Sequence, residues 1–210
     1  MASSSQTGGT LFVVTAPSGT GKTSLIKALM EKETDLGLSI SHTTRPPRRG
    51  EENGREYHFI SVEDFCERKE RGEFLEWAEV YGNLYGTSRQ AVLERVSNGK
   101  DTLLEIDWQG AMQIRRLLPE AVSIFILPPS IPTLEDRLKK RGLDTPESIA
   151  RRMQTAQKEM SHASRFDYVI INDEFDTALF QLIAVVTAIN CRFTGQAHRN
   201  ARLFKQLGVA

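Results

Sequence analysis

Four residues near the amino end have the types and spacing that bind phosphate groups in proteins. They are Gly19, Gly21, Lys22 and Thr23, in the segment APSGTGKT at residues 16–23. In the pattern G-x-x-x-x-G-K-[ST], backbone N–H groups and a helix amino end surround phosphate oxygens. The lysine reaches the β- and γ-phosphates of a nucleotide, and the hydroxyl ligates Mg²⁺. The segment therefore predicts a nucleotide-phosphate site, and a glycine-rich turn without a ligand is the alternative.

Ala16 departs from this pattern, because it stands where the first glycine is expected. An alanine in the left-handed region costs roughly 1–2 kcal/mol. We therefore expect an ordinary negative φ at Ala16, which leaves the phosphate chemistry of the loop unchanged.

Two acidic residues, Glu105 and Asp107, end a buried strand in the segment TLLEID. Nucleotides bound to parallel sheets lie outside the carboxyl ends of the strands. Solvated strand-end acids are the alternative, but beside a phosphate loop we expect a role in the water shell of the metal or in substrate recognition.

A second cluster suits another anion. Arg45 and Arg48 lie in the segment SHTTRPPRRG, where two prolines favour an extended backbone that repeats every three residues. Both arginines are therefore expected to project the same way, and their planar groups bind phosphate bidentately. Tyr57 and Tyr85 offer hydroxyls to the same oxygens. A solvated basic loop beside two core aromatics, or a proline-rich peptide ligand, would be the alternatives.

Glu76 stands on an alternating segment that is typical of a β-strand. The pattern divides the residues between two faces, Leu75, Trp77 and Tyr81 on one and Phe74, Glu76, Ala78 and Val80 on the other. A carboxylate among apolar neighbours needs donors. Guanine offers adjacent N1–H and N2–H₂ donors, whereas adenine does not, so Glu76 is a candidate for reading the base. A structural salt bridge is the alternative.

The elements that position these residues follow an α/β pattern. Strand-length apolar runs alternate with helical periodicity, which predicts a parallel sheet. We expect strands at 10–14, 101–107, 123–127 and 167–171, and helices at 23–33, 109–118, 133–141 and 175–192. Residues 38–97 interrupt the alternation as a mostly antiparallel insertion. It holds a short helix that Ser61 caps, with Asp64 at its third position and Gly72 past its end.

Composition excludes several classes of partner. The 210-residue chain has 27 Lys plus Arg and 27 Asp plus Glu, so it has no global field to gather nucleic acid or an anionic membrane. No apolar run approaches the ~18 residues of a membrane span. Residues 1–9 lack the features of a secretion signal and are expected to form a disordered tail. We expect a cytoplasmic protein that binds neither nucleic acid nor membrane.

The two cysteines, Cys66 and Cys191, match no metal or redox spacing. We expect both to be small buried or half-buried thiols in a reducing compartment.

Seven segments together resemble one family. They are APSGTGKTS, SHTTRPPRRGEENGREYHF, FLEWAEVYGNLYGTS, LLEIDWQGA, IFILPPS, RLKKRG and IINDEFD, which occur in family order over roughly residues 10–192. The chain resembles guanylate kinases of the compact bacterial type, which are nucleoside-monophosphate kinases. The resemblance implies a P-loop fold with a parallel-sheet core, a mixed GMP-binding insertion and a mobile helical lid.

The resemblance also assigns boundaries. Residues 10–37, 98–132 and 156–210 would form the P-loop core, 38–97 the GMP-binding subdomain and 133–155 the lid, after the tail at 1–9. Ala16 is a common variant in the family. Glu105 stands where the family often has Asp, and it would act on the metal through water.

Site residues carry over position by position. Lys22 and Thr23, with Ala16, Pro17, Ser18, Gly19, Thr20 and Gly21, would bind ATP, and Asn172 would lie near the adenine. The GMP phosphate would be held by Arg45, Arg48, Tyr57 and Tyr85. Guanine would be read by Ser41, Glu76, Thr87 and Asp107, the hydroxyls serving O6 and the acids the N1/N2 edge. The transferring group would be met by Lys22, Arg45, Arg137, Arg141 and Arg152.

The implied reaction is MgATP + GMP ⇌ ADP + GDP, with dGMP as a further acceptor, in purine nucleotide metabolism. Three rivals stay open: a peptide-binding module, a kinase of sugar phosphates and a nucleic-acid-dependent ATPase. A peptide-binding module would tend to lose the phosphate loop, which this chain keeps. A kinase of sugar phosphates would not require Glu76, Ser41 and Thr87 together. A nucleic-acid-dependent ATPase would need an electropositive track, which a chain with no net charge does not indicate. Homo-oligomer formation is left open by the sequence.

Overall fold

A five-stranded parallel sheet forms the centre of the protein. The computed structural model describes residues 8–140 and 146–209. The strand order is β2-β7-β1-β8-β9, and the strands are β2 (Gly37–Ser39), β7 (Thr102–Glu105), β1 (Leu11–Thr15), β8 (Val122–Leu127) and β9 (Tyr168–Ile171). Four of these strands were predicted to within two residues at each end. The fifth, β2, lies across the predicted boundary between residues 37 and 38.

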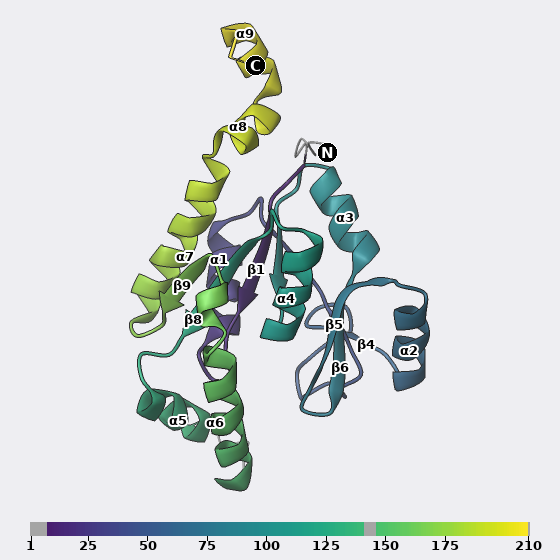
Figure 1. Cartoon of the computed structure of the whole chain (residues 1–210), viewed down its shortest axis with the longest axis vertical. Coiled ribbons are helices and arrows are strands. Elements are labelled where there is room, and N and C mark those ends of the chain that lie inside the picture. Colours follow the sequence, from purple (N-terminus) through teal and green to yellow (C-terminus); the bar gives the residue numbers. More distant parts are fainter. Residues whose placement is uncertain (1–7, 141–145, 210) are drawn as a thin grey trace.

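Helices cover both faces of this sheet (Figure 1). One apolar cluster joins it to α1 (Lys22–Lys32) and α7 (Phe175–Asn190). The other joins it to α3 (Arg89–Ser97) and α4 (Trp108–Leu117). Strands with both faces covered are expected to be apolar throughout, and every residue of β1 is buried. The α/β fold class with a parallel core is therefore confirmed.

A second, four-stranded sheet lies beside the core in the order β4-β3-β6-β5. Its strands are β3 (His42–Thr43), β4 (His58–Phe59), β5 (Phe74–Val80) and β6 (Asn83–Ser88). Two strand pairs are antiparallel and β3–β4 is parallel, as expected of a mostly antiparallel insertion. The short helix α2 (Val62–Glu70) begins after Ser61, whose hydroxyl accepts from the Asp64 N–H at 3.0 Å, which confirms the predicted cap.

The tip of the β5–β6 hairpin differs from the sequence-based expectation. Strand β5 ends at Val80, and Tyr81 and Gly82 form the turn with φ of 51° and 75°. Tyr81 was expected to share a strand face with Leu75 and Trp77. It leaves that face because a two-residue hairpin turn requires positive φ at its centre.

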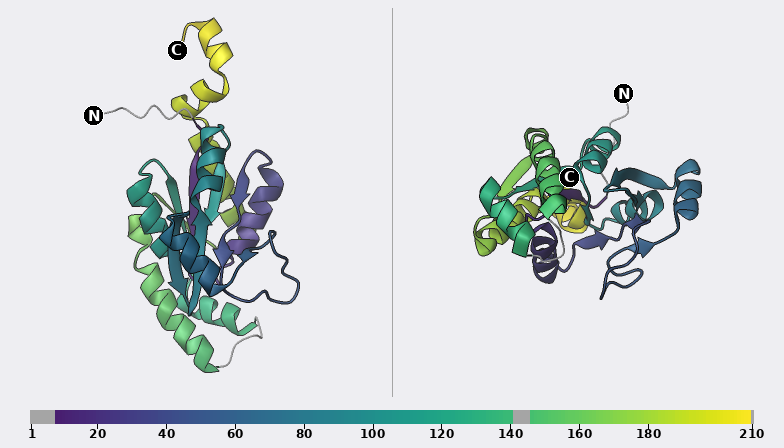
Figure 2. Two further views of the ribbon diagram at one scale, coloured as in Figure 1. Left: turned by 90° about the vertical axis from the view of Figure 1, so that its right-hand side faces the viewer. Right: turned by 90° about the horizontal axis from the view of Figure 1, so that it is seen from below.

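Two helices extend past the carboxyl ends of the core strands (Figures 1 and 2). They are α5 (Ile131–Lys140) and α6 (Pro146–Met160), and a small apolar cluster of Leu134, Leu138 and Ala156 packs them together. The 3-10 helix Ala163–Arg165 follows. The predicted helix ending at residue 141 stops at Lys140 in the described part of the chain. Arg141 lies outside the described residues.

The carboxyl-terminal helices lie at the opposite end from α5 and α6 (Figure 1). The predicted helix 175–192 ends at Asn190, and α8 (Phe193–Arg199) and α9 (Ala201–Leu207) follow. In the described residues no single helix has the length and apolarity to cross a membrane. The pair α7 and α8 would pass together, but it bends by 70°.

Both cysteines are exposed and unpaired, Cys66 on α2 and Cys191 at the carboxyl end of α7. The expectation of buried or half-buried thiols is therefore wrong. Cys66 lies on the solvent side of α2, next to the buried Phe65, and Cys191 follows the last residue of α7 in an exposed turn.

One buried carboxylate fastens the carboxyl-terminal helices to the core. Asp101 accepts from the Thr10 N–H at 2.7 Å and from the Arg199 guanidinium at 2.8 Å. We predict that Asp101→Asn lowers the free energy of unfolding by about 1–3 kcal/mol, because the buried pair with Arg199 loses its negative charge and one of its two acceptor oxygens. Urea denaturation measures the loss, with Asp35→Asn, at an exposed position, as the control. Equal stability of the two variants would contradict this account.

Candidate active site

The loop after β1 has the geometry of a phosphate cradle. Gly19 and Gly21 have φ of 91° and 90°, and Gly21 is the N-cap of α1. A Cβ at Gly19 would lie 2.8 Å from Leu138 Cδ2, and one at Gly21 would lie 2.7 Å from Asn172 Nδ2. Both glycines are therefore required by conformation and by space, and they turn the chain into the amino end of α1.

Ala16 does not disturb this loop. Tyr81 is the only non-glycine residue with positive φ in the described residues, so Ala16 has the expected negative φ. Ala16 packs on the core, and the hydroxyl of the buried Thr20 donates to the Pro17 carbonyl oxygen at 2.7 Å.

Lys22, Thr23 and Glu105 meet at the mouth of the loop. The Lys22 Nζ donates to the Ile106 carbonyl oxygen at 3.1 Å and lies 3.9 Å from Glu105 Oε1. The Thr23 hydroxyl donates to the same Oε1 at 2.7 Å. Hydroxyl and carboxylate oxygens are the hard donors that Mg²⁺ binds, few from the protein and the rest from phosphates and water. The described residues contain no group of three or more His, Cys, Asp or Glu side chains that could hold a metal ion.

Two of the predicted residues, Asn172 and Arg137, hold the phosphate loop in place through hydrogen bonds to its backbone. The buried Asn172 donates from Nδ2 to the Thr20 carbonyl oxygen at 2.6 Å. Arg137, on α5, donates to the Asn172 carbonyl oxygen at 3.0 Å and lies 3.5 Å from that of Thr20. Asn172 therefore positions the loop, and its contact with adenine stays a prediction.

The predicted anion clamp contains an acid that sequence reasoning missed. The Arg45 Nη2 donates to both Glu51 carboxylate oxygens at 2.9 Å, and the Arg48 N–H donates to Glu51 Oε2 at 2.7 Å. These contacts hold the pKa of Glu51 below its usual value, although burial opposes them. Glu51 thus fixes Arg45 and the backbone of Arg48. Only the prolines in the segment signalled a fixed geometry.

The aromatic residues of the clamp surround Arg45. Its guanidinium carbon lies 5.4 Å from the centre of the Tyr57 ring and 5.8 Å from that of Phe59, and Tyr85 is a hydrogen-bonding partner. The Tyr57 and Tyr85 rings meet edge to face at 5.8 Å. The predicted group of Arg45, Tyr57 and Tyr85 is therefore brought together. Arg48 contacts this group only through its backbone N–H, which donates to Glu51, and its side chain is exposed.

The two clusters face one volume. Burial raises the pKa of Tyr57 to about 12, and the Glu105 carboxylate adds to this rise. Tyr57 belongs to the arginine cluster and Glu105 to the phosphate loop, so their charges interact across the space between the two sheets.

Glu76 is a buried carboxylate, with 4% of its surface exposed. Its Oε1 accepts from the Thr87 hydroxyl at 2.5 Å, and the two residues face each other across β5 and β6. Burial raises the pKa of Glu76 to about 7, and the nearby Asp107 adds to the rise. The sequence alternative, a structural salt bridge, is wrong, because the partner is a neutral hydroxyl.

Space for this carboxylate comes from α4. A Cβ at Gly110 would lie 2.1 Å from Glu76 Oε2, so only glycine fits there. Asp107 caps α4, accepting from the Gly110 N–H and from Gln109 Nε2, each at 3.0 Å. Sequence analysis missed Gly110, because a glycine within a helix carries no signal of the side chain that it admits.

The remaining predicted residues lie around these clusters. Ser41 and Thr87 are buried, and β3, which begins after Ser41, pairs at His42 with Gly86. Arg152 lies on α6 against the ring of Tyr81. Glu159, near the end of α6, was not singled out by the sequence. Burial and Asp107 raise its pKa to about 7, while Lys22 and the Ser18 N–H oppose that rise.

The fold and the site define a class. A parallel α/β core with a phosphate loop after β1, facing an arginine–tyrosine cluster on an inserted sheet, is the arrangement of a P-loop enzyme that brings two phosphorylated compounds together.

Comparisons with known proteins narrow the class. The sequence model of the family described as Guanylate kinase matches residues 8–189. The chain is 59% identical over 201 residues to a guanylate kinase of Cupriavidus metallidurans, covering 96% of this chain and 93% of that one. It is 53% identical, over 96% and 94%, to one of Bordetella pertussis. The crystal structure of guanylate kinase from Anaplasma phagocytophilum superposes with a TM-score of 0.79 at 30% identity, covering 97% of each chain.

The chain therefore belongs to the guanylate kinase family. It is a nucleoside-monophosphate kinase, which confirms the resemblance and the enzyme class inferred from the seven sequence segments.

The raised pKa of Glu76 predicts a pH-dependent stability. Burial raises this pKa from 4.5 to about 7, so the folded protein binds the proton more tightly than the unfolded chain. The resulting stabilisation is complete below pH 4.5 and is lost as the pH rises through 7. It should amount to about 3 kcal/mol.

Urea denaturation of the wild type and Glu76→Gln across this range measures the effect. Glu159 titrates in both proteins and cancels in the difference. The wild type should lose stability relative to the variant between pH 4.5 and 7, and parallel curves would contradict the burial argument.

Proposed function

We propose that this chain catalyses reversible transfer of the γ-phosphoryl group from ATP to GMP, giving ADP and GDP, in purine nucleotide metabolism, and that it also accepts dGMP. The observation that carries the proposal is the buried Glu76 carboxylate, which has spare acceptor capacity on the same inserted sheet as the arginine–tyrosine cluster. Membership of the guanylate kinase family supports the same reaction.

The donor nucleotide would bind at the loop of residues 16–23. The N–H groups around Gly19 and Gly21 would surround its phosphates, and Lys22 would reach the β- and γ-phosphates. Thr23 would ligate Mg²⁺, with Glu105 acting through water, because their oxygens lie 2.7 Å apart. When bound, Mg²⁺ would reduce the negative charge on the phosphates. Asn172 would border the adenine while bracing Thr20.

The phosphate of GMP would bind at the clamp of Arg45, Arg48, Tyr57 and Tyr85. The support is that Glu51 and the two aromatic rings already fix the Arg45 guanidinium. A cation held in place before binding loses less side-chain entropy when the phosphate arrives.

Guanine would be read at Glu76. Its carboxylate would accept the N1–H and N2–H₂ donors, with the Thr87 hydroxyl still bonded to Oε1. The hydroxyls of Ser41 and Thr87, both buried, would serve O6. Asp107 would support the same edge from the start of α4. Adenine would leave this buried carboxylate without donors, which discriminates by about 10⁴ in comparable sites.

Chemistry in this site would consist of positioning and charge stabilisation. The attacking GMP phosphate is already an anion, so no protein base is required. Lys22, Arg45, Arg137, Arg141 and Arg152 would offset the charge of two polyanions. The inserted sheet (38–97) and the lid (133–155) would close over the substrates and exclude water, and residues 10–37, 98–132 and 156–210 would form the core. We place the reaction in the cytoplasm, where both substrates occur.

A coupled assay of ADP release tests the function. With GMP, dGMP, AMP, UMP and no acceptor in turn, we expect turnover with GMP and dGMP only. Glu76→Gln should lower the ratio of the rate with GMP to the rate with AMP by at least about 10-fold, because the glutamine amide group donates a hydrogen where guanine also donates one. Equal rates with AMP and GMP would contradict the base assignment, and no turnover with any acceptor would favour a binding module.

Removing the charge of Glu51 tests the clamp. Glu51→Gln should raise the KM for GMP by about 10-fold while leaving that for ATP unchanged, because Arg45 loses the pair that holds it. Glu52→Gln is a matched control, since Glu52 pairs with Arg55 in an exposed position. Steady-state kinetics with each substrate varied give both constants. Equal changes for the two variants would show that Glu51 does not position Arg45.

A further inference from the structure

The tip of the β5–β6 hairpin places a large side chain where the backbone favours a small one. Tyr81 has φ of 51°, in the left-handed region that Asn and Gly adopt most easily in two-residue turns. For tyrosine this conformation costs roughly 1–2 kcal/mol. A tyrosine at this position therefore needs a compensating contact.

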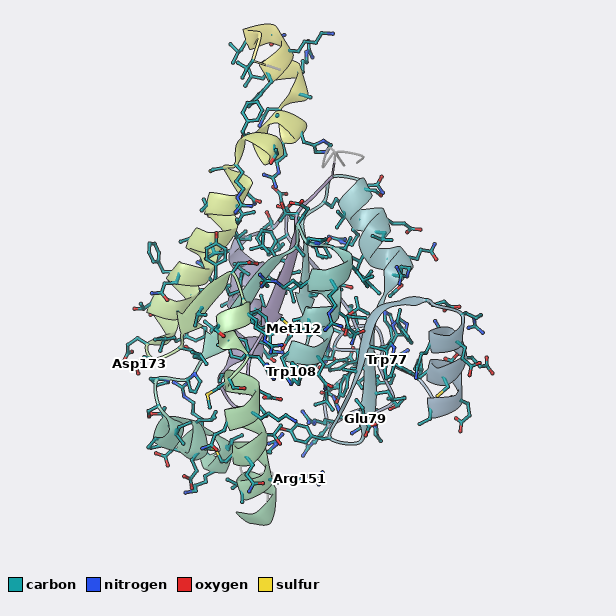
Figure 3. All side chains as sticks on the ribbon, in the orientation of Figure 1. Trp77, Glu79, Trp108, Met112, Arg151 and Asp173 are labelled. Atoms are coloured by element: carbon teal, nitrogen blue, oxygen red, sulfur yellow. The ribbon has the colours of Figure 1, made fainter. Side chains whose placement is uncertain are left out.

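That contact is with α6, on the other side of the active site. The Arg152 guanidinium carbon lies 5.9 Å from the centre of the Tyr81 ring. The Tyr81 hydroxyl has Thr155 as a hydrogen-bonding partner, and the charges of Arg151 and Glu159 also act on it. The Thr155 hydroxyl also donates to the Arg151 carbonyl oxygen at 3.0 Å. Figure 3 shows Arg151 on the side of α6 that faces the hairpin.

One face of α6 connects the hairpin to the phosphate loop. Arg152, Thr155 and Glu159 are spaced by three and four residues and so lie along one side of the helix. Glu159 interacts with Lys22 and with the Ser18 N–H. Past the end of α6, His162 stacks on Trp108, at the start of α4, with 3.8 Å between the ring centres. The hairpin tip therefore touches a helix whose far end is fixed at the donor site.

We propose that Tyr81 is a positioning residue, which docks the GMP-binding sheet on α6 and holds Arg152 toward the transferring phosphoryl group. The proposal rests on the proposed function, because it takes Arg152 to act on that group. Closure of the acceptor sheet and placement of a donor-side cation are then one event. ATP bound without an acceptor meets an incomplete site, which limits its hydrolysis.

A double-mutant cycle tests the coupling. Tyr81→Asn suits the turn and removes the ring, and it should lower kcat by about 3- to 30-fold, as expected for loss of one cation–π contact. The KM values for GMP and ATP should change by less than about 2-fold. In the Arg152→Ala background the same substitution should cost nothing further. Multiplicative losses would overturn the proposal.

Failure of the inference is distinguishable from failure of the proposed function. If the wild type does not turn over GMP, the proposed function itself is contradicted. Full activity of Arg152→Ala, with GMP turnover intact, would remove Arg152 from the site and overturn the coupling while leaving the reaction standing.

Stability measurements exclude a merely structural role. Tyr81→Asn should keep or raise Tm, because asparagine tolerates the left-handed conformation. Asn83→Ala is the matched control, since the Asn83 side chain donates to the Tyr81 carbonyl oxygen at 3.2 Å within the same turn. This control should lower Tm without changing kcat. A fall in kcat that tracks Tm across both variants would overturn the proposal, as would a Tyr81→Asn variant with wild-type kcat.

Discussion

The rest of the site depends on one contact between the inserted sheet and a helix of the core, where the Glu76 carboxylate of β5 lies against Gly110 of α4. A Cβ at Gly110 would stand 2.1 Å from Glu76 Oε2, so this helix approaches the strand closely enough to remove the carboxylate from water. Burial without a cation costs free energy, and the raised pKa of Glu76 records that cost. A ligand with two adjacent N–H donors would offset this free-energy cost by hydrogen bonding to the carboxylate.

The same junction sets where the two proposed phosphate sites lie relative to each other. Because β5 and α4 are joined, the arginine–tyrosine cluster of the inserted sheet faces the carboxyl ends of β1 and β7, where the phosphate loop and Glu105 lie. Glu51 and Asn172 have parallel roles on the two sides. Glu51 fixes a cation of the acceptor cluster, and Asn172 fixes the loop of the donor cluster. Helix α6 lies beside both clusters. Arg152, in the middle of the helix, contacts Tyr81, and Glu159, near its end, interacts with Lys22 and Ser18 of the loop.

Much of this was predictable from local sequence, because the signals are local. Unbroken apolar runs gave the core strands, and the spacing of glycine, lysine and threonine gave the loop. Two of the missed features depend on distant partners. Gly110 and Tyr81 act through residues on other elements, and a single sequence does not say which side chain will lie opposite. Glu51 pairs with Arg45 within its own loop, where several charged residues stand close in sequence and no pattern says which of them pair. The expectation for the cysteines was wrong for another reason. Burial of a small thiol depends on its exact place in a helix: Cys66 lies on the outer face of α2, and Cys191 lies just past the end of α7.

The central claim is that a buried carboxylate reads two adjacent donors of the acceptor base. Comparing kcat/KM for GMP and IMP isolates this, since IMP keeps N1–H and O6 and lacks only the 2-amino group. The account predicts that GMP is preferred by about 100-fold or more, because IMP leaves a buried carboxylate oxygen without a donor. Equal kcat/KM values for GMP and IMP would contradict it.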